Sequence, residues 1–286
     1  MMVGSAASTI DAPITRHDTT QMQDPSRPDT WRGADYAQHS GLQEAMAAQA
    51  LGLLALRGDE HGLDIGCGDG RISARIAAQR VPRGSVCGTD ASADMIAFAQ
   101  RQHGEVPNLR FTAIDARQLH FDASFDAAVS FNALHWVPDL LPALRGLRAA
   151  LRPDGKAWVR LVTQGPVISL EAVAEQVRHE AAWTPLLIGF DDPYLRLEPE
   201  QVATLALSAK LGVLSLHTRL AHCDFGNRAA LFGFCSAGFG AWTHLLPQER
   251  HDDFVGAVLY RYLATRDGVA STVFRYYQTD LALTVA

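Results

Sequence analysis

The chain has 286 residues, of which 48% are hydrophobic and 20% charged, and its formal net charge is -6. This length fits one elaborated α/β domain, and the negative charge argues against a nucleic-acid-binding surface. The four cysteines include no C-x-x-C pair, so neither a zinc site nor a disulfide framework is indicated, and we expect a cytoplasmic protein. No window reaches the roughly eighteen uninterrupted apolar residues of a membrane span, so no membrane partner is expected.

The first part of the chain differs in composition from the rest. Residues 1–30 are rich in Ser, Thr, Asp and Pro and lack both the charged and the apolar region of a signal peptide. We expect a disordered or loosely ordered tail there. A single domain is expected over residues 31–286, beginning with an Ala- and Leu-rich cap helix over 40–57.

From residue 61 onward, short apolar runs alternate with helical patterns. The runs HGLDIG, GSVCGTD, NLRFTAID, FDAAVSF and KAWVRLVT predict strands over 61–66, 84–90, 108–115, 125–131 and 156–163. A helix with a leucine face precedes the last of these strands and is expected to end at the turn Pro153-Asp154-Gly155. Repeated β–α units of this length predict a doubly wound, mainly parallel α/β sheet with helices on both faces.

The pattern changes after residue 163. Two late strand candidates, over 212–225 and 272–286, are separated by helical patterns, which predicts an antiparallel pair at the sheet edge. We expect lid insertions at about 165–200 and 226–270. The predicted fold is therefore a seven-stranded Rossmann-like sheet, mainly parallel, with an antiparallel edge strand and a helical lid.

Three glycines in LDIGCGDG, Gly66, Gly68 and Gly70, follow the first strand and precede a helix. A dinucleotide fingerprint is G-x-G-x-x-G, but Arg71 occupies the position of its third glycine, and no Lys-Ser/Thr pair of a P-loop follows. A tight turn with exposed amides at a helix N-terminus suits a carboxylate or a nucleoside. Asp64 is then a candidate to bind a cation at that turn.

With Asp90 and Asp115 after the second and third strands, this pattern resembles the class I S-adenosylmethionine-dependent methyltransferases. The resemblance extends from about residue 31 to the C-terminus and is strongest over 62–159. It implies S-adenosyl-L-methionine as cofactor, with Asp90 accepting the ribose hydroxyls and Asp115 a hydrogen bond from the adenine amino group. Taken alone, Asp90 could cap the next helix, and Asp115 is more typical of a turn or cap. The cofactor-binding residues that the resemblance implies are Tyr36, Asp64, Gly66, Cys67, Gly68, Asp90, Ala91, Asp115, Ala116, Ser130 and Asn132.

Three further stretches resemble a branch of this family that acts on small carboxylates, namely the trans-aconitate, malonyl-carrier-protein and juvenile hormone acid methyltransferases. The stretches are DYAQHSGLQ, ALHW after the fourth strand, and a late Leu-Pro-x-Glu-Arg segment. The likeness implies that Gln43 and Trp136 hold the substrate carboxylate as neutral N–H donors. A carboxylate is ionised at pH 7, so its methylation requires no general base.

Other interpretations of the same residues stay open. His135 is either structural or a general base for methylation of a phenolic oxygen or a carbon, a role for which His39 is the other candidate. A protein of this fold that binds the cofactor without transferring a methyl group is a third possibility, because fold alone does not establish function.

His217, His222 and Cys223 predict no metal site, since the two histidines lie on opposite faces of a strand. Five aromatic residues indicate either lid core or a pocket for an apolar or acyl substrate: Phe225, Phe232, Phe234, Phe239 and Trp242. A monomer and a homodimer are both compatible with the sequence.

Overall fold

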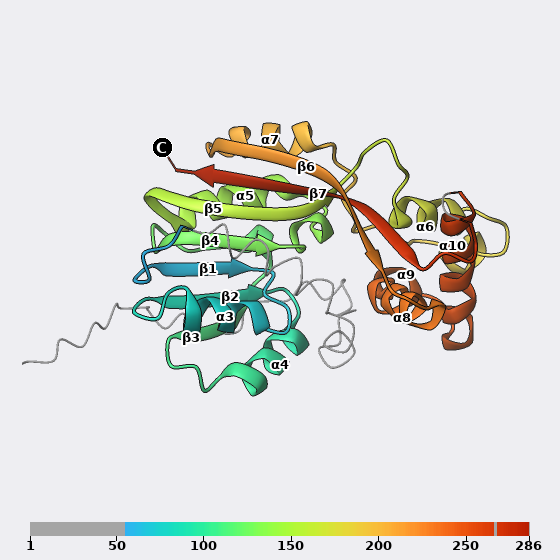
Figure 1. Cartoon of the computed structure of the whole chain (residues 1–286), viewed down its shortest axis with the longest axis horizontal. Coiled ribbons are helices and arrows are strands. Elements are labelled where there is room, and N and C mark those ends of the chain that lie inside the picture. The colour runs from blue at the N-terminus through green and yellow to red at the C-terminus, as the bar shows by residue number, and fades with distance from the viewer. Residues whose placement is uncertain (1–54, 266–267, 286) are drawn as a thin grey trace, which may run out of the picture.

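The computed structural model describes residues 55–265 and 268–285. Its centre is a seven-stranded sheet in the order β3-β2-β1-β4-β5-β7-β6 (Figure 1). The strands are β1 (His61–Ile65), β2 (Ser85–Asp90), β3 (Leu109–Ala113), β4 (Phe125–Phe131), β5 (Leu151–Thr163), β6 (Gly212–Asp224) and β7 (Val273–Thr284). Strands β1 to β5 pair in parallel, whereas β7 is antiparallel to both β5 and β6. The predicted seven-stranded, mainly parallel sheet is confirmed, with the antiparallel strand β7 next to the edge strand β6.

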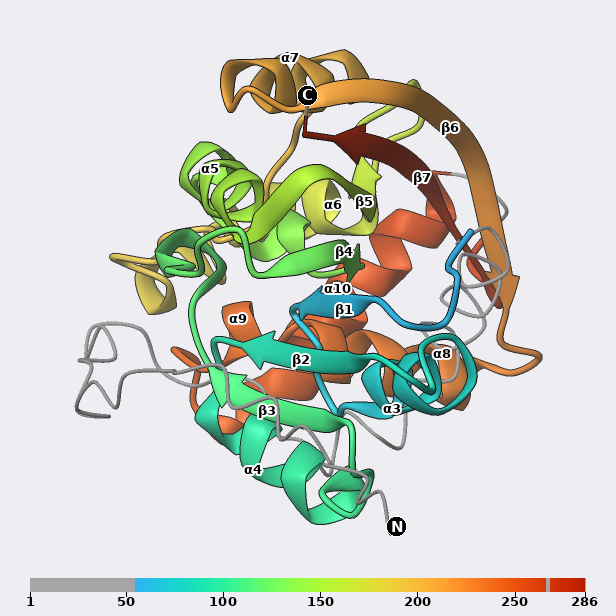
Figure 2. The same ribbon diagram turned by 90° about the vertical axis from the view of Figure 1, so that its left-hand side faces the viewer.

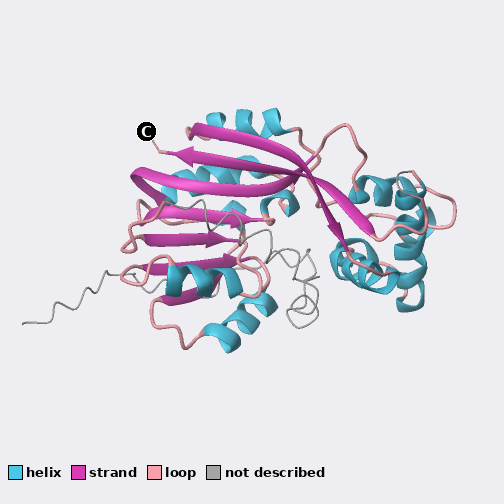
Figure 3. Cartoon of the chain, viewed as in Figure 1, coloured by secondary structure: helices cyan, strands magenta, loops and turns pink. Residues whose placement is uncertain are grey.

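Helices cover both faces of the sheet (Figures 2 and 3). The α-helices are α3 (Arg71–Gln79), α4 (Ala93–His103), α5 (Leu140–Ala150), α6 (Leu170–Arg178), α7 (Pro199–Ser208), α8 (Arg228–Gly238), α9 (Gly240–Thr243) and α10 (His251–Ala264). Four short 3-10 helices are η1 (Ala116–Gln118), η2 (Leu134–Trp136), η3 (Thr184–Leu186) and η4 (Gln248–Arg250). The leucines of α5 share a buried cluster with Cys87, whereas Ile76 of α3 packs with Val86. Successive residues of a strand point to opposite faces, so α3 and α5 lie on opposite faces of the sheet.

Local signals in the sequence explain where several elements begin and end. Ser92 caps α4, because its hydroxyl accepts a hydrogen bond from the amide of Met95. β5 begins at Leu151 rather than at the predicted Lys156. The predicted Pro153-Asp154-Gly155 turn is present as an irregularity in the register between β4 and β5, where Asp154 has a φ of 62°.

The lid helices form a layer of their own. Helices α8, α9 and α10 connect β6 to β7, and together with α6 they lie beyond the carboxyl ends of β1 and β4 (Figure 1). Their hydrophobic cluster is separate from those of the sheet and includes the first residues of β7. Phe239 and Trp242 are buried in this cluster, and the three earlier aromatic residues of the run pack against it. The aromatic run therefore packs within the lid, and a pocket for an apolar substrate beside it remains a prediction.

Some predictions lie outside the described residues. These are the tail over 1–30, Tyr36, Gln43 and most of the helix predicted over 40–57, of which only Ala55, Leu56 and Arg57 are described, without regular secondary structure. Within the described parts of the chain, no helix combines the length and apolar character needed to cross a bilayer.

Candidate active site

The glycine turn after β1 has an unusual backbone. Gly66, Gly68 and Gly70 have φ values of 74°, 54° and 79°, a region that residues with a Cβ rarely adopt. A Cβ on Gly66 would lie 2.1 Å from the Cβ of Ala133, and one on Gly70 would lie 2.6 Å from Cζ of Phe111. The chain's own packing therefore requires glycine at both positions, apart from any ligand.

Backbone hydrogen bonds hold this turn against the end of β2. The amides of Gly66 and Cys67 both donate to the carbonyl of Thr89, at 2.7 and 2.9 Å. The amide of Gly68 donates to Oδ2 of Asp90 at 2.9 Å, and Oδ1 of the same carboxylate accepts from the amide of Ser92. Asp90 thus orders the turn, and its contact with the ribose hydroxyls remains a prediction.

Asp64 lies beneath the turn, with only 2% of its surface exposed. Its Oδ2 accepts a hydrogen bond from the hydroxyl of Ser73 on α3, at 2.6 Å. Burial raises the pKa of Asp64 to about 7, and the carboxylates of Asp90 and Asp69 act in the same direction. A nearby positive charge stabilises the charged form of a carboxyl group whose pKa is near 7. Asp64 therefore fits a cationic ligand in the turn.

The end of β3 approaches the same place, because the amide of Ile114 donates to the carbonyl of Asp90 at 2.9 Å. Asp115 caps η1 by accepting a hydrogen bond from the amide of Arg117 at 2.9 Å, and its carboxylate forms an ion pair with the guanidinium of Arg117 at 2.6 Å. Ala116 is the first residue of η1 and is half-buried, whereas Ala91, which follows β2, is exposed. The capping role of Asp115 is present, and its contact with an adenine remains a prediction.

The predicted residues at the end of β4, and Cys67 in the glycine turn, have different roles. Ser130 is completely buried, and its hydroxyl donates to the carbonyl of Ile65 at 2.8 Å, so it joins β4 to the end of β1. Asn132 has a φ of 57°, and its amide donates to the carbonyl of Arg160 on β5. Cys67 is buried, and burial raises the pKa of its thiol well above the ordinary value, while its amide is bonded to the carbonyl of Thr89.

His135 is buried at the end of β4. Its Nδ1 accepts a hydrogen bond from the amide of Val162 at 3.3 Å, which requires a ring without a proton on that nitrogen. Burial lowers the pKa of His135 to about 3. The ring is therefore neutral at pH 7, with its proton on Nε2, where it is a donor and not a base.

Trp136 is half-buried and lies among aromatic residues of the lid. Its ring is 5.0 Å from the ring of Tyr194 and 6.0 Å from that of Trp242, in edge-to-face geometry. Among the described residues, neither the hydroxyl of Tyr194 nor Nε1 of Trp242 has a hydrogen-bond partner. A buried donor without a partner costs about 1–3 kcal/mol.

The sequence did not single out Tyr194, and it indicated Trp242 only as one of five aromatic residues of either a lid core or a substrate pocket. Trp242 belongs to the aromatic run that the sequence shows, so a signal for it existed. Tyr194 lies in a Pro- and Asp-containing loop with no periodic pattern, and only the tertiary contacts with His135 and Trp136 reveal its position.

Comparisons with known proteins agree with this arrangement. Residues 63–157 match the family described as "Methyltransferase domain". The chain is 39% identical over 132 residues to trans-aconitate 2-methyltransferase of Deinococcus radiodurans, an alignment covering 46% of this chain and 49% of that protein. It is 33% identical over 103 residues to juvenile hormone acid O-methyltransferase of Drosophila melanogaster, covering 34% of this chain and 35% of that protein. The aligned part thus spans about half, or less, of the length of these curated relatives.

A solved structure shares the fold. Phosphoethanolamine N-methyltransferase 2 of Haemonchus contortus, in complex with S-adenosyl-L-methionine, matches with a TM-score of 0.57 at 17% identity, covering 88% of this chain and 56% of that chain. The matched domain, the shared fold and the glycine turn followed by Asp90 support a class I S-adenosylmethionine-dependent methyltransferase domain over residues 63–157.

Proposed function

We propose that this protein transfers the methyl group of S-adenosyl-L-methionine to a carboxylate oxygen of a small molecule in the cytoplasm, forming a methyl ester. Two of the relatives named above are methyltransferases of acids by their names, trans-aconitate and juvenile hormone acid. The proposal takes from them the chemical class of the acceptor and not the particular acid.

The state of His135 is the observation that carries this choice of acceptor. Methylation of a phenol or of a carbon acid requires removal of a proton, which calls for a base with a pKa near the working pH. His135 has a pKa of about 3 and uses Nδ1 to accept from Val162, so it does not fill that role. A carboxylate requires no base, because it is already ionised at neutral pH.

The residues at the strand ends fit the cofactor by their chemistry. Asp90 would accept the ribose hydroxyls, Asp115 and the amide of Ala116 would bind the adenine, and the charged form of Asp64 would favour the cationic end. The bound cofactor supplies an electrophilic methyl group. Trp136 and Gln43 would orient the carboxylate toward it, and α6 with α8 to α10 would exclude water as a lid. Because both donors are neutral, they hold the anion without neutralising its charge.

The test is incubation of the protein with cofactor and a panel of carboxylic acids, followed by mass spectrometry. We expect one acid to gain one methyl group that mild alkali removes. An alkali-stable product would reject the ester assignment. Tight cofactor binding without transfer to any acid would favour a binding protein of the same fold.

Two variants probe the substrate side of the proposal. Gln43→Ala and Trp136→Phe should each weaken use of the acid by about tenfold or more, while the dissociation constant of the cofactor changes little. Equal effects on acid and cofactor would contradict the assignment of these residues to the carboxylate.

A further inference from the structure

Two donors buried in the lid face the same aromatic ring and have no acceptor among the described residues. Tyr194 is 6% exposed and Trp242 is completely buried, and both contact Trp136 edge to face. The hydroxyl of Tyr194 and Nε1 of Trp242 are each inaccessible to solvent and have no hydrogen-bond partner in residues 55–265 and 268–285. Folded proteins rarely retain such donors without a compensating role, because each is costly to bury.

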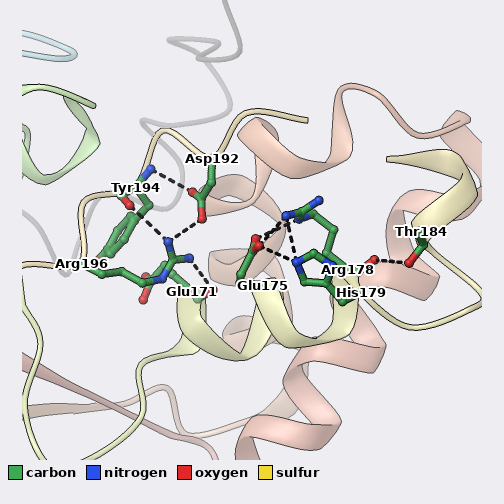
Figure 4. Close-up of polar contacts among 8 residues, drawn as sticks. All are labelled: Glu171, Glu175, Arg178, His179, Thr184, Asp192, Tyr194 and Arg196. Atoms are coloured by element: carbon green, nitrogen blue, oxygen red, sulfur yellow. Dashed lines mark hydrogen bonds and ion pairs between the residues drawn. The ribbon is translucent and has the colours of Figure 1, made fainter. Parts of the chain in front are cut away.

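The loop that carries Tyr194 is held in place by its own polar contacts (Figure 4). Oδ1 of Asp192 accepts from the amide of Tyr194 at 2.9 Å, and Oδ2 of the same carboxylate pairs with Arg196. Arg196 also donates to the carbonyls of Tyr194 and of Glu171 on α6, at 3.3 and 3.0 Å. The amide of Leu195 donates to the carbonyl of His135, which anchors the loop to the end of β4. Tyr194 is thus positioned next to Trp136 by contacts that do not use its hydroxyl.

The surrounding charges indicate what these donors bind. Burial and the nearby Glu171 carboxyl raise the pKa of Tyr194 well above its ordinary value, so the hydroxyl remains a donor. The cluster around it contains two carboxyl groups, Glu171 and Asp192, and one guanidinium, Arg196. As far as the described residues go, this cluster has no surplus positive charge to balance an added anion. An uncharged oxygen acceptor therefore fits better than a second carboxylate.

We infer that Tyr194 and Trp242 are substrate-positioning residues that donate hydrogen bonds to an uncharged carbonyl oxygen on the apolar body of the acid. The inference rests on the proposed function, and it narrows the substrate class to acids that carry a second, neutral oxygen function. The aromatic rings of Trp136, Tyr194 and Trp242 supply the apolar surroundings for that body.

Access to Nε1 of Trp242 involves the loop before Tyr194. The ring of Phe190 packs on Trp242 at 5.8 Å, and it follows Gly189, which has a φ of 79° and no neighbour within 4 Å of a Cβ position. Displacement of Phe190 would uncover the part of the Trp242 ring on which it packs. The neighbouring glycine permits that backbone movement.

The test compares pairs of medium-chain acids that differ only by one keto group in the chain. Binding is measured by calorimetry with S-adenosylhomocysteine present, and turnover by methyl transfer from the cofactor. We expect Tyr194→Phe and Trp242→Phe each to weaken binding of the preferred keto acid about 3- to 10-fold, and that of its deoxo partner less than about 2-fold. Tyr260→Phe, at a position 61% exposed on α10, is the matched control and should change the binding of neither the keto acid nor its deoxo partner.

Stability separates this role from a purely structural one. Tyr194→Phe removes a hydroxyl without a partner, so the unliganded variant should unfold at the same temperature as the wild type or at a higher one. If Tyr194→Phe weakened binding of the keto acid and of its deoxo partner equally, or weakened binding of neither, the inference would be overturned.

Failure of the inference and failure of the proposed function give different results. If the wild type methylates acids, but Tyr194→Phe binds keto and deoxo acids as tightly as the wild type does, the proposed function stands and the inference is wrong. If the wild type binds keto acids through Tyr194 but methylates none of them, the proposed function is wrong and the inference stands. Absence of both binding and transfer rejects both.

Discussion

Gly66 and Asp64 illustrate how single residues of the glycine turn are constrained by the protein itself. Gly66 has a positive φ and touches Ala133 at the start of the β4–η2 connection. Asp64 is enclosed beneath the turn and bonded to Ser73. Both constraints can be measured without knowledge of the substrate.

Replacement of Gly66 by alanine should destabilise the protein. The new Cβ would overlap Ala133 and would also be strained at a φ of 74°, so we expect a loss of roughly 2–4 kcal/mol in the free energy of unfolding. Urea unfolding measures this loss. Gly256→Ala, at a helical position in α10 with open space around it, is the control and should stabilise by up to about 1 kcal/mol. Similar effects of the two changes would contradict the packing argument.

The carboxyl of Asp64 should make stability depend on pH. Its pKa is about 7 in the folded protein and about 3.9 in an unfolded chain, so the folded state binds more protons between these values. Its contribution is therefore fully present below about pH 4 and is lost as the pH rises through 7. At about 1.4 kcal/mol for each pKa unit, wild type should lose a few kcal/mol relative to Asp64→Asn between pH 4.5 and 8. Parallel pH profiles of the two proteins would show that Asp64 is ionised throughout.

At the scale of elements, hydrogen bonds fasten the loop between α6 and α7 to residues that follow β4 and β5. Leu195 donates to the carbonyl of His135, and Gln164 donates to the carbonyl of Leu197, both at 2.8 Å. Arg196 adds the ion pair with Asp192 and the link to α6. The position of Tyr194 beside Trp136 depends on these ties.

Arg196→Met keeps the length of the side chain and removes the link. Because Asp192 and the carbonyl of Glu171 would then lose their partner in a partly buried place, we expect a loss of about 1–3 kcal/mol in the free energy of unfolding. Proteolysis should also cut the loop sooner in the variant. Arg57→Met breaks an exposed ion pair with Asp59 and should cost less than about 1 kcal/mol. A cost at Arg196 no larger than at Arg57 would show that the loop is held by other contacts.

At the scale of the whole molecule, the carboxyl ends of β1, β2 and β3 meet through the hydrogen bonds of Thr89 and Asp90, and the lid stands beyond them (Figure 1). This is the place where open α/β sheets bind ligands. The lid has its own hydrophobic cluster, distinct from those beneath the sheet helices, so lid and sheet contribute separately to stability.

Cofactor binding should stabilise the whole fold. A ligand that binds only the folded state adds about 2.7 kcal/mol at one hundred times its dissociation constant. Thermal unfolding with and without S-adenosyl-L-methionine should show this as a rise in the melting temperature. Asp90→Ala, which removes the acceptor of the Gly68 amide, should abolish most of the rise. A wild type whose melting temperature does not respond to the cofactor would contradict the site.

The sequence alone determined the strands β1 to β4 and the glycine turn, because periodicity and glycine spacing act over a few neighbouring positions. It also predicted the lid between β6 and β7. Only the tertiary structure decided that Nδ1 of His135 accepts from Val162, that Ser130 joins two strands, and that Tyr194 and Trp242 meet at Trp136. Those contacts join segments far apart in the chain, and burial, which sets the pKa values of Asp64 and His135, exists only after the segments have packed.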